Sequence, residues 1–206
     1  MHVMSTSDVF IRLLDFVFPP SVELCTVRAL RISDIPYLFF EKNVHGTITL
    51  SDFRDPKTRA LIHEAKFHGN EHALNLLGAL FLMHLEYTPN RYEIIAPIPL
   101  SPTRKRSRGY NQVEEILKRA AKRTSLPIKP SLLVRIKNTR PQTDLSKSDR
   151  LKNLDGAFKV SDPIRVTGKH ILLVDDVLTT GATLTAARTA LLPYRPASIT
   201  CLALAH

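Results

Sequence analysis

Residues 170–183, HILLVDDVLTTGAT, constrain the fold of this chain more than any other stretch. Residues 171–174 are an apolar run typical of a buried strand, and Asp175 and Asp176 follow it at once. A loop of small residues then opens a helix, whose apolar residues recur at spacings of three and four before Pro193 ends it. This order predicts an α/β fold with a ligand site at the end of a parallel strand.

The same stretch carries the residue types that bind a ribose phosphate. A helix start leaves backbone N–H groups unpaired and carries the positive end of the helix dipole, so small residues can wrap those donors around a phosphate. Carboxylates can accept hydrogen bonds from the paired hydroxyls of a ribose. We expect Asp175 and Asp176 to hold the ribose, and the 5-phosphate to lie on Thr179, Thr180, Gly181, Ala182 and Thr183. The structural alternative is a solvated strand end followed by an ordinary helix start.

Composition sets the frame for this site. With 206 residues, 44% of them hydrophobic, the chain can bury one sizeable core, and we expect one domain with an appendage. It has no apolar run of about 18 residues and no tripartite leader, so we expect a soluble cytoplasmic protein without membrane insertion. Cys25 and Cys201 form neither a disulfide framework nor a metal quartet, which agrees with a reducing compartment.

The net charge of +10 is concentrated in the middle of the chain. Residues 101–152 contain 15 lysines and arginines against 4 acidic residues, whereas the rest of the chain is close to neutral. A local basic block implies a polyanionic partner, either nucleic acid or a phosphorylated small molecule. For any single lysine or arginine, a solubilising surface position is the competing interpretation.

A second anion site is predicted after a strand at residues 92–96. Pro97 and Pro99 cannot continue a central strand, so a stiff loop must begin there and run into the sequence SPTRKRSRGYNQ. The basic residues of that loop are Arg104, Lys105, Arg106 and Arg108. Guanidinium groups and freed backbone N–H groups both fit phosphate oxygens. Lys66, at the end of a helix that Asp55 and Pro56 are expected to start, could reach a phosphate as well.

Residues 138–153 are a long polar and basic stretch interrupted by Pro141. A loop of this length in a compact domain is usually either disordered or a functional lid. We favour a lid because chemistry on a diphosphate ester requires water to be excluded.

Histidines at positions 63, 68, 72 and 84 raise the question of a metal site. Their spacings cross Gly69 and lack the i, i+4 pairing of a helix-borne site, so we expect surface or helix-end positions instead.

Four segments occur here in the order and spacing typical of one family: AKFHG, PIPLSPTRKRSRGYNQ, RPQTDLSKSDRLKNLDGAF and HILLVDDVLTTGAT. Over residues 50–206 the chain resembles the ComF/GntX family. Its last segment resembles the signature of type I phosphoribosyltransferases, which use 5-phosphoribosyl 1-diphosphate (PRPP). The resemblance implies a type I phosphoribosyltransferase fold, with a central parallel sheet flanked by helices in residues 51–206 and a small hood built partly from the N-terminal region.

The resemblance also implies roles for individual residues. The catalytic residues would be Asp175, Asp176 and Arg104. The pyrophosphate would bind to Lys66, Pro97, Ile98, Pro99, Leu100 and Arg104. The flexible active-site loop would contain Arg140, Gln142, Thr143 and Arg150. Mg²⁺ is expected to bind mainly through PRPP, with Asp175 and Asp176 as the protein groups that could contribute.

Residues 1–50 are expected to be a degenerate N-terminal region. Members of the family commonly begin with a cysteine-pair zinc finger, but FPPSVELCTVRAL contains Cys25 alone. One thiol cannot complete a structural site with four ligands, so we predict no zinc. Residues 37–40 and 47–50, joined by a turn at His45 and Gly46, could form a hairpin at the edge of the core.

The implied reaction is substitution at the anomeric carbon of PRPP by an unidentified acceptor, with release of pyrophosphate, in a protein linked to competence and DNA uptake. Two other classes stay open: a PRPP or nucleotide sensor without catalysis, and a single-stranded DNA-binding factor that works with the competence machinery. Base stacking needs aromatics, and the strongest basic run contains only Tyr110, which weakens the second class. The oligomeric state stays open, with a dimer as one option.

Overall fold

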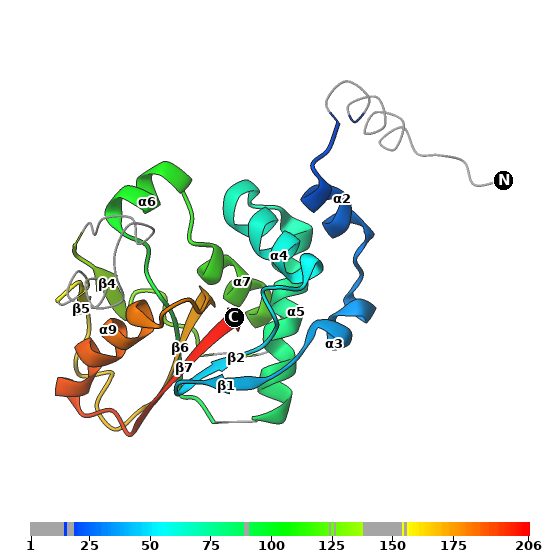
Figure 1. Ribbon diagram of the computed structural model, residues 1–206. Helices are drawn as coiled ribbons and strands as arrows, with labels where there is room; N and C mark the ends of the chain where they lie inside the picture. Colours follow the sequence, from blue (N-terminus) through cyan, green and yellow to red (C-terminus); the bar gives the residue numbers. More distant parts are fainter. Residues whose placement is uncertain are drawn as a thin grey trace.

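The structure is a computed structural model that describes residues 15, 19–88, 91–123, 125, 127–137, 154 and 156–206. At its centre is a five-stranded sheet with the strand order β1-β2-β7-β6-β3 (Figure 1). The strands are β1 (Lys42–Val44), β2 (Thr47–Thr49), β3 (Ile94–Pro97), β6 (His170–Val177) and β7 (Ser198–Ala205). Neighbouring strands are parallel except for β1, which pairs antiparallel with β2 at one edge. The predicted α/β fold with a parallel sheet is confirmed, and the antiparallel strand is an addition to it.

Helices cover both faces of the sheet. On one face lie α4 (Pro56–His63), α5 (Glu71–Tyr87) and α7 (Gln112–Ala121), and on the other lie α9 (Ala182–Leu191) and the two-stranded antiparallel sheet of β4 (Leu133–Arg135) and β5 (Phe158–Val160). The remaining elements are α2 (Val22–Ala29), η1 (Ile32–Asp34), α3 (Ile35–Leu38), the π-helical turn η2 (Glu64–His68), α6 (Pro102–Arg108) and η4 (Leu192–Tyr194). Within the described residues, no helix combines the length and the apolarity that a bilayer span requires.

Strand β6 explains why the sheet needs cover on both sides. Successive side chains of a strand point to opposite faces. Leu172 and Val174 pack against the helices of one face, whereas Ile171 and Leu173 pack against α9 and the β4–β5 sheet, and all four are fully buried. A strand that is buried on both faces has to be continuously apolar, and this pattern is why β6 can be recognised in the sequence.

Two helix starts follow the predicted capping residues. The Asp55 side chain accepts hydrogen bonds from the N–H groups of Lys57 and Thr58, and Pro56 is the first residue of α4. The Asn70 side chain accepts from the N–H of Ala73 at the start of α5. These caps satisfy donors that a helix start leaves unpaired.

Two sequence expectations are wrong in detail. Residues 37–40 do not form a strand, since Tyr37 lies in the short helix α3 and the hairpin instead pairs Val44 directly with Thr47. Positive φ angles at His45 and Gly46 form the two-residue turn that this register requires. The basic segment after residue 101 is the helix α6 and not a loop, because Ser101 caps it and a proline occupies its first position.

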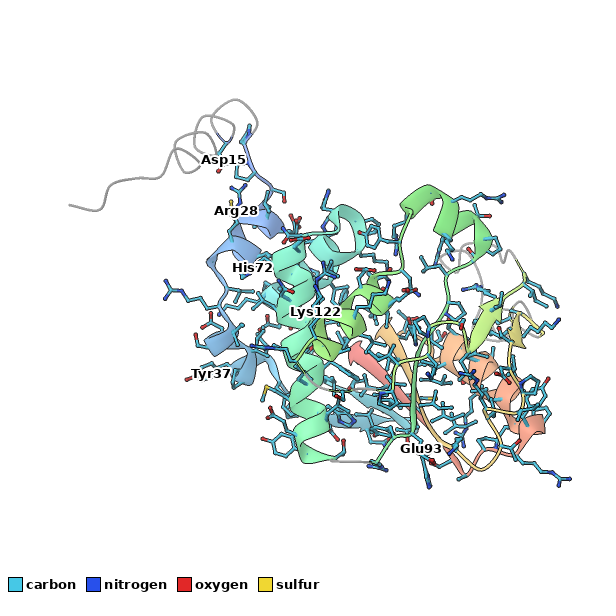
Figure 2. The ribbon with its side chains drawn as sticks, turned by 180° about the vertical axis from the view of Figure 1, so that it is seen from behind. Asp15, Arg28, Tyr37, His72, Glu93 and Lys122 are labelled. Carbon is cyan, nitrogen blue, oxygen red and sulfur yellow. The ribbon has the colours of Figure 1, made fainter. Side chains whose placement is uncertain are left out.

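Two of the residues labelled in Figure 2, His72 and Glu93, join segments that are distant in the sequence. His72 Nε2 lies 2.8 Å from the carbonyl oxygen of Leu30, which joins the start of α5 to the chain after α2. The Glu93 carboxylate accepts from Lys169 Nζ at 2.7 Å and from the N–H of His170 at 3.0 Å. This contact holds the starts of β3 and β6 together. Because the two strands are parallel, their carboxyl ends lie side by side at the other end of the strands, which we call the carboxyl edge of the sheet.

Candidate functional site

The acidic pair lies at that carboxyl edge. Asp175 and Asp176 belong to the last part of β6, and Pro97 of β3 pairs with Val174 immediately before them. The loop that follows β3 therefore begins beside the two acids. Asp175 is partly exposed, whereas Asp176 is only 9% exposed. The two carboxylates consequently have different surroundings.

Asp176 is held by the protein itself. Its Oδ2 accepts from Gln112 Nε2 at 2.6 Å and lies 3.2 Å from Lys66 Nζ, and its Oδ1 accepts from the N–H of Val177 at 2.7 Å. Gln112, itself 3% exposed, accepts from Arg108 through Oε1 at 2.6 Å. Because a carboxamide can donate from its nitrogen and accept at its oxygen, the Gln112 side chain links Arg108 to Asp176 through two hydrogen bonds, a relay that holds Arg108 near the acid.

Asp175 has fewer protein partners. Its Oδ1 accepts from the N–H of Asp176 at 2.9 Å. The surrounding protein removes much of the contact of Asp175 with water, and this loss, followed by the negative charge of Asp176, raises the pKa of Asp175 from 3.8 to about 7. A carboxyl group whose charge is disfavoured in this way is suited to receive a cation or hydrogen-bond donors from a ligand.

The phosphate cradle predicted after β6 is present as a turn and a helix start. Gly181 has φ of +74° and precedes the first residue of α9, Ala182, whose N–H lies 3.5 Å from Thr180 Oγ1. Asp175, Thr179 and Thr183 line a small cavity there together with this turn. The left-handed conformation favours glycine at position 181, because glycine has no Cβ that would clash with the backbone there.

A pocket of about 400 Å³ joins these parts. Its wall consists of Lys66, Ile98, Pro99, Leu100, Arg104, Arg108, Asn111, Gln112, Val113, Arg135, Asp175, Asp176, Val177, Thr179 and Thr183. The acids and the two threonines therefore face the loop after β3 and four basic side chains. Four cationic groups against two carboxylates give the pocket an excess of positive charge, which favours an anionic ligand.

Most of the predicted site residues come together in this pocket, and some do not. Gly181 and Ala182 line only the adjoining small cavity, and Pro97 is buried in β3. Thr180 lines neither space, although its hydroxyl contacts the turn. The predicted lid residues Arg140, Gln142, Thr143 and Arg150 lie outside the described residues.

Several residues of the pocket were not predicted. Asn111 caps α7 and donates from Nδ2 to the carbonyl oxygen of Ile98 at 2.9 Å, which fixes the loop after β3. Arg135 reaches the pocket from β4 and is 8% exposed, and burial, more than repulsion by Arg104, lowers its pKa. The sequence signal for Asn111 and Gln112 was their place directly after the basic segment. No feature of the sequence pointed to Arg135 as a pocket residue.

Lys66 reaches the pocket from the π-helical turn η2. The carbonyl oxygen of Ala65 accepts from Tyr110 Oη at 2.9 Å, and this ties the turn to the chain between α6 and α7. Gly69 ends the turn with φ of +60°, and a Cβ there would lie 3.4 Å from the Tyr110 ring. A π-helical turn is rare and is frequent at functional sites, and here it presents a lysine to Asp176.

Comparison with known proteins adds a family to this geometry. The family model described as the phosphoribosyl transferase domain matches residues 97–206. Competence protein F of Haemophilus influenzae is 37% identical over 93 residues, which cover 45% of this chain and 41% of that protein. DNA utilization protein YhgH of Escherichia coli K12 is 29% identical over 144 residues, covering 66% of this chain and 61% of that protein. The chain thus spans about 41% to 61% of the length of these two relatives.

Solved structures resemble the chain more remotely. The orotate phosphoribosyltransferase of Mycobacterium tuberculosis H37Rv superposes with a TM-score of 0.36 at 17% identity, covering 83% of this chain and 78% of that one.

Proposed function

Because this chain belongs to the phosphoribosyl transferase domain family, and is a ComF-family protein that resembles the type I phosphoribosyltransferases, we propose that it binds PRPP together with Mg²⁺. We propose further that it transfers the phosphoribosyl group of PRPP to an acceptor. One observation carries the proposal. One pocket is lined by the two acids at the end of β6, by Thr183 of α9 and by four basic side chains. PRPP needs a diol site between two separate anion sites. The acids and the basic side chains share the pocket, and the turn at Gly181 lines the small cavity that adjoins it at Asp175.

The ribose end is assigned to β6 and α9. Asp175 lines both the pocket and the small cavity, and it would accept from the ribose hydroxyls. Asp176, held by Lys66 and Gln112, would keep the strand end in place and supply the second acceptor. The 5-phosphate would lie on the N–H groups at Gly181 and Ala182, where the dipole of α9 favours negative charge.

We assign the diphosphate end of PRPP to the four basic side chains of the pocket. Lys66, Arg104, Arg108 and Arg135 would bind the diphosphate oxygens and stabilise the charge that grows on them as the C1–O bond breaks. The loop fixed by Asn111 would hold the reacting carbon in register with these groups. The acceptor nucleophile would form the new bond to C1 as the C1–O bond breaks, and pyrophosphate would leave with the electron pair of that bond.

The residues present fit Mg²⁺ bound together with PRPP. This ion prefers oxygen ligands, few of which come from the protein when a diphosphate supplies the others. Asp175 is the partly exposed carboxylate of the pocket, and it is the residue that would hold the ion. When bound, Mg²⁺ would neutralise part of the charge on the departing diphosphate.

Calorimetry with PRPP and MgCl₂ tests the proposal on the wild type and on the double variant Asp175→Asn/Asp176→Asn. We expect binding by the wild type that requires Mg²⁺ and is lost in the variant. No binding by the wild type would contradict catalysis and sensing alike. If PRPP binds, pyrophosphate release is measured across a panel of amines and nucleobases, and no turnover with any of them would favour a sensor.

Single-stranded DNA binding is the second candidate, and one tertiary contact favours it. Phe67 is 59% exposed, and the centre of its ring lies 5.6 Å from the guanidinium of Arg108, the last residue of the basic helix α6. An exposed aromatic next to arginines is a platform on which bases can stack. The names of the two relatives, which refer to competence and DNA utilization, are consistent with this function.

Fluorescence anisotropy with labelled single-stranded DNA tests the second candidate. We expect the affinity to fall steeply with added salt and to fall further in Phe67→Ala. Phe40→Ala is the matched control, because Phe40 is 65% exposed and follows α3, whereas Phe67 lies at Arg108 of α6. Equal losses in both variants would contradict a stacking role for Phe67.

A further inference from the structure

Three potential metal ligands gather at the π-helical turn, outside the pocket wall. His63, Glu64 and His68 each offer one ligand atom, and these atoms lie within 4.8 Å of one another. The rings of His63 and His68 have centroids 5.6 Å apart. The histidines at positions 72 and 84 have other partners, since His72 contacts the carbonyl oxygen of Leu30 and His84 lies between Glu41 and Tyr92.

The π-helical turn creates this cluster. Helix-borne metal sites pair residues at i and i+4, and by that rule positions 63 and 68 do not match. In η2, however, the N–H of Gly69 bonds to the carbonyl oxygen of Glu64, so the neighbour one turn onward is at i+5. The wider turn brings His68 back over His63. The spacing that argues against a metal in an α-helix therefore supports one here.

The buried charge of Glu64 calls for a cation. Glu64 is 2% exposed, and its Oε2 accepts from the neutral Asn70 side chain at 3.2 Å. Its Oε1 lies 3.9 Å from His68 Nε2, which is too far for a hydrogen bond. A buried carboxylate is costly unless it is paired or coordinates a metal.

His63 also has an unmet requirement. Its Nδ1 is buried and has no hydrogen-bond partner in the described part of the chain. A buried ring nitrogen without a partner is unfavourable, and coordination of Nδ1 would remove that cost. His68 is 59% exposed, so its side chain can move without disturbing the core.

We propose that His63, Glu64 and His68 bind one divalent transition-metal ion of the Zn²⁺ class, with water completing the coordination. Two imidazoles and one carboxylate suit zinc and its neighbours, whereas Mg²⁺ prefers oxygen ligands alone. Bonds of about 2.0–2.2 Å bring tetrahedral ligand atoms to roughly 3.4 Å from one another. The longest separation in the cluster thus has to shorten by up to about 1.4 Å, and rotation of the exposed His68 side chain can contribute to this shift.

The ion would clamp the turn that carries Lys66. Its ligands lie on both sides of this lysine in the sequence, so coordination would fix the turn from both ends. Lys66 contacts Asp176 from this turn, which couples the metal to the pocket. The sequence pattern predicts no zinc, because Cys25 is the lone thiol of the N-terminal region and His63 and His68 lack α-helical i, i+4 spacing.

The test uses the full chain, ZnCl₂ in calorimetry and CoCl₂ as a spectroscopic probe. We expect one equivalent of metal, visible d–d bands of Co²⁺ in a nitrogen and oxygen site, and a loss of affinity of about tenfold or more in His68→Ala and in His63→Ala. His45→Asn is the matched control, because His45 is an exposed histidine outside the cluster and asparagine tolerates its φ of +50°.

His68→Ala changes an exposed side chain, so its circular dichroism and melting temperature without metal should match those of the wild type. Metal affinity in His68→Ala or His63→Ala equal to that of the wild type would overturn the site. So would equal losses in His45→Asn, which would indicate adventitious binding by surface histidines. No binding of Zn²⁺ or Co²⁺ by the wild type also overturns it. None of these outcomes depends on PRPP binding.

Discussion

Replacing Asp175 by asparagine should stabilise the ligand-free protein. The folded state raises the pKa of this carboxyl from 3.8 to about 7, so the ionised form is disfavoured by folding. The interval corresponds to at most about 4 kcal/mol of unfolding free energy. Asparagine carries no charge, and its Oδ1 can still accept from the N–H of Asp176, so the variant loses the cost and keeps the hydrogen bond.

The sign of the pH dependence follows from proton binding. Between pH 3.8 and about 7 the folded state retains a proton on Asp175 that the unfolded state has released, so wild-type stability falls as pH rises through this range. The stability contributed by the protonated group is complete below the lower value and lost above the upper one. From about pH 5 to about pH 8, the advantage of Asp175→Asn over the wild type should grow by roughly 2–3 kcal/mol.

Urea unfolding of both proteins at those two pH values measures the difference, with the m-value as the check that the same surface unfolds. Asp176→Asn is the matched control, because its carboxylate is bound by Lys66, Gln112 and the N–H of Val177. That change should lower the unfolding free energy by about 1–3 kcal/mol. An advantage of Asp175→Asn that is the same at both pH values would refute the reasoning, and so would equal effects of the two substitutions.

Three further changes give distinct outcomes. Gln112→Met removes a donor to Asp176, so we expect the unfolding free energy to fall by about 1–3 kcal/mol and PRPP to bind more weakly in calorimetry; unchanged values would show that the relay is not needed. Gly181→Ala should cost about 1–2 kcal/mol in urea unfolding because of its φ of +74°, since the added Cβ meets only ordinary contacts; a neutral result would contradict the left-handed turn. His84→Phe buries an aromatic ring where a fully buried histidine bonds to Glu41 at 2.8 Å, and a fall in melting temperature equivalent to about 2 kcal/mol is expected; a more stable variant would contradict the network.

Much of the fold was readable because its signals are local. The strand β6 is continuously apolar over residues 171–174, and each of its faces packs against a different layer. Asp55 and Asn70 mark helix starts by satisfying N–H groups a few residues onward. The same capping pattern is present at Ser101, where a serine followed by a proline begins α6, but a helix was not predicted there. The loop prediction rested on Pro97 and Pro99, which end a strand but do not indicate where the next helix begins.

The sequence by itself determined that Asp175 and Asp176 lie at a strand end beside a phosphate-binding turn, since a buried strand, two acids and a helix start are contiguous in it. Only the tertiary structure decided that these acids differ. Gln112 meets Asp176 across 64 residues, and Lys66 reaches it from a turn whose π-helical form no local pattern announces. Contacts between distant segments depend on how layers pack, and packing alone leaves Asp176 bound by the protein and Asp175 open to a ligand.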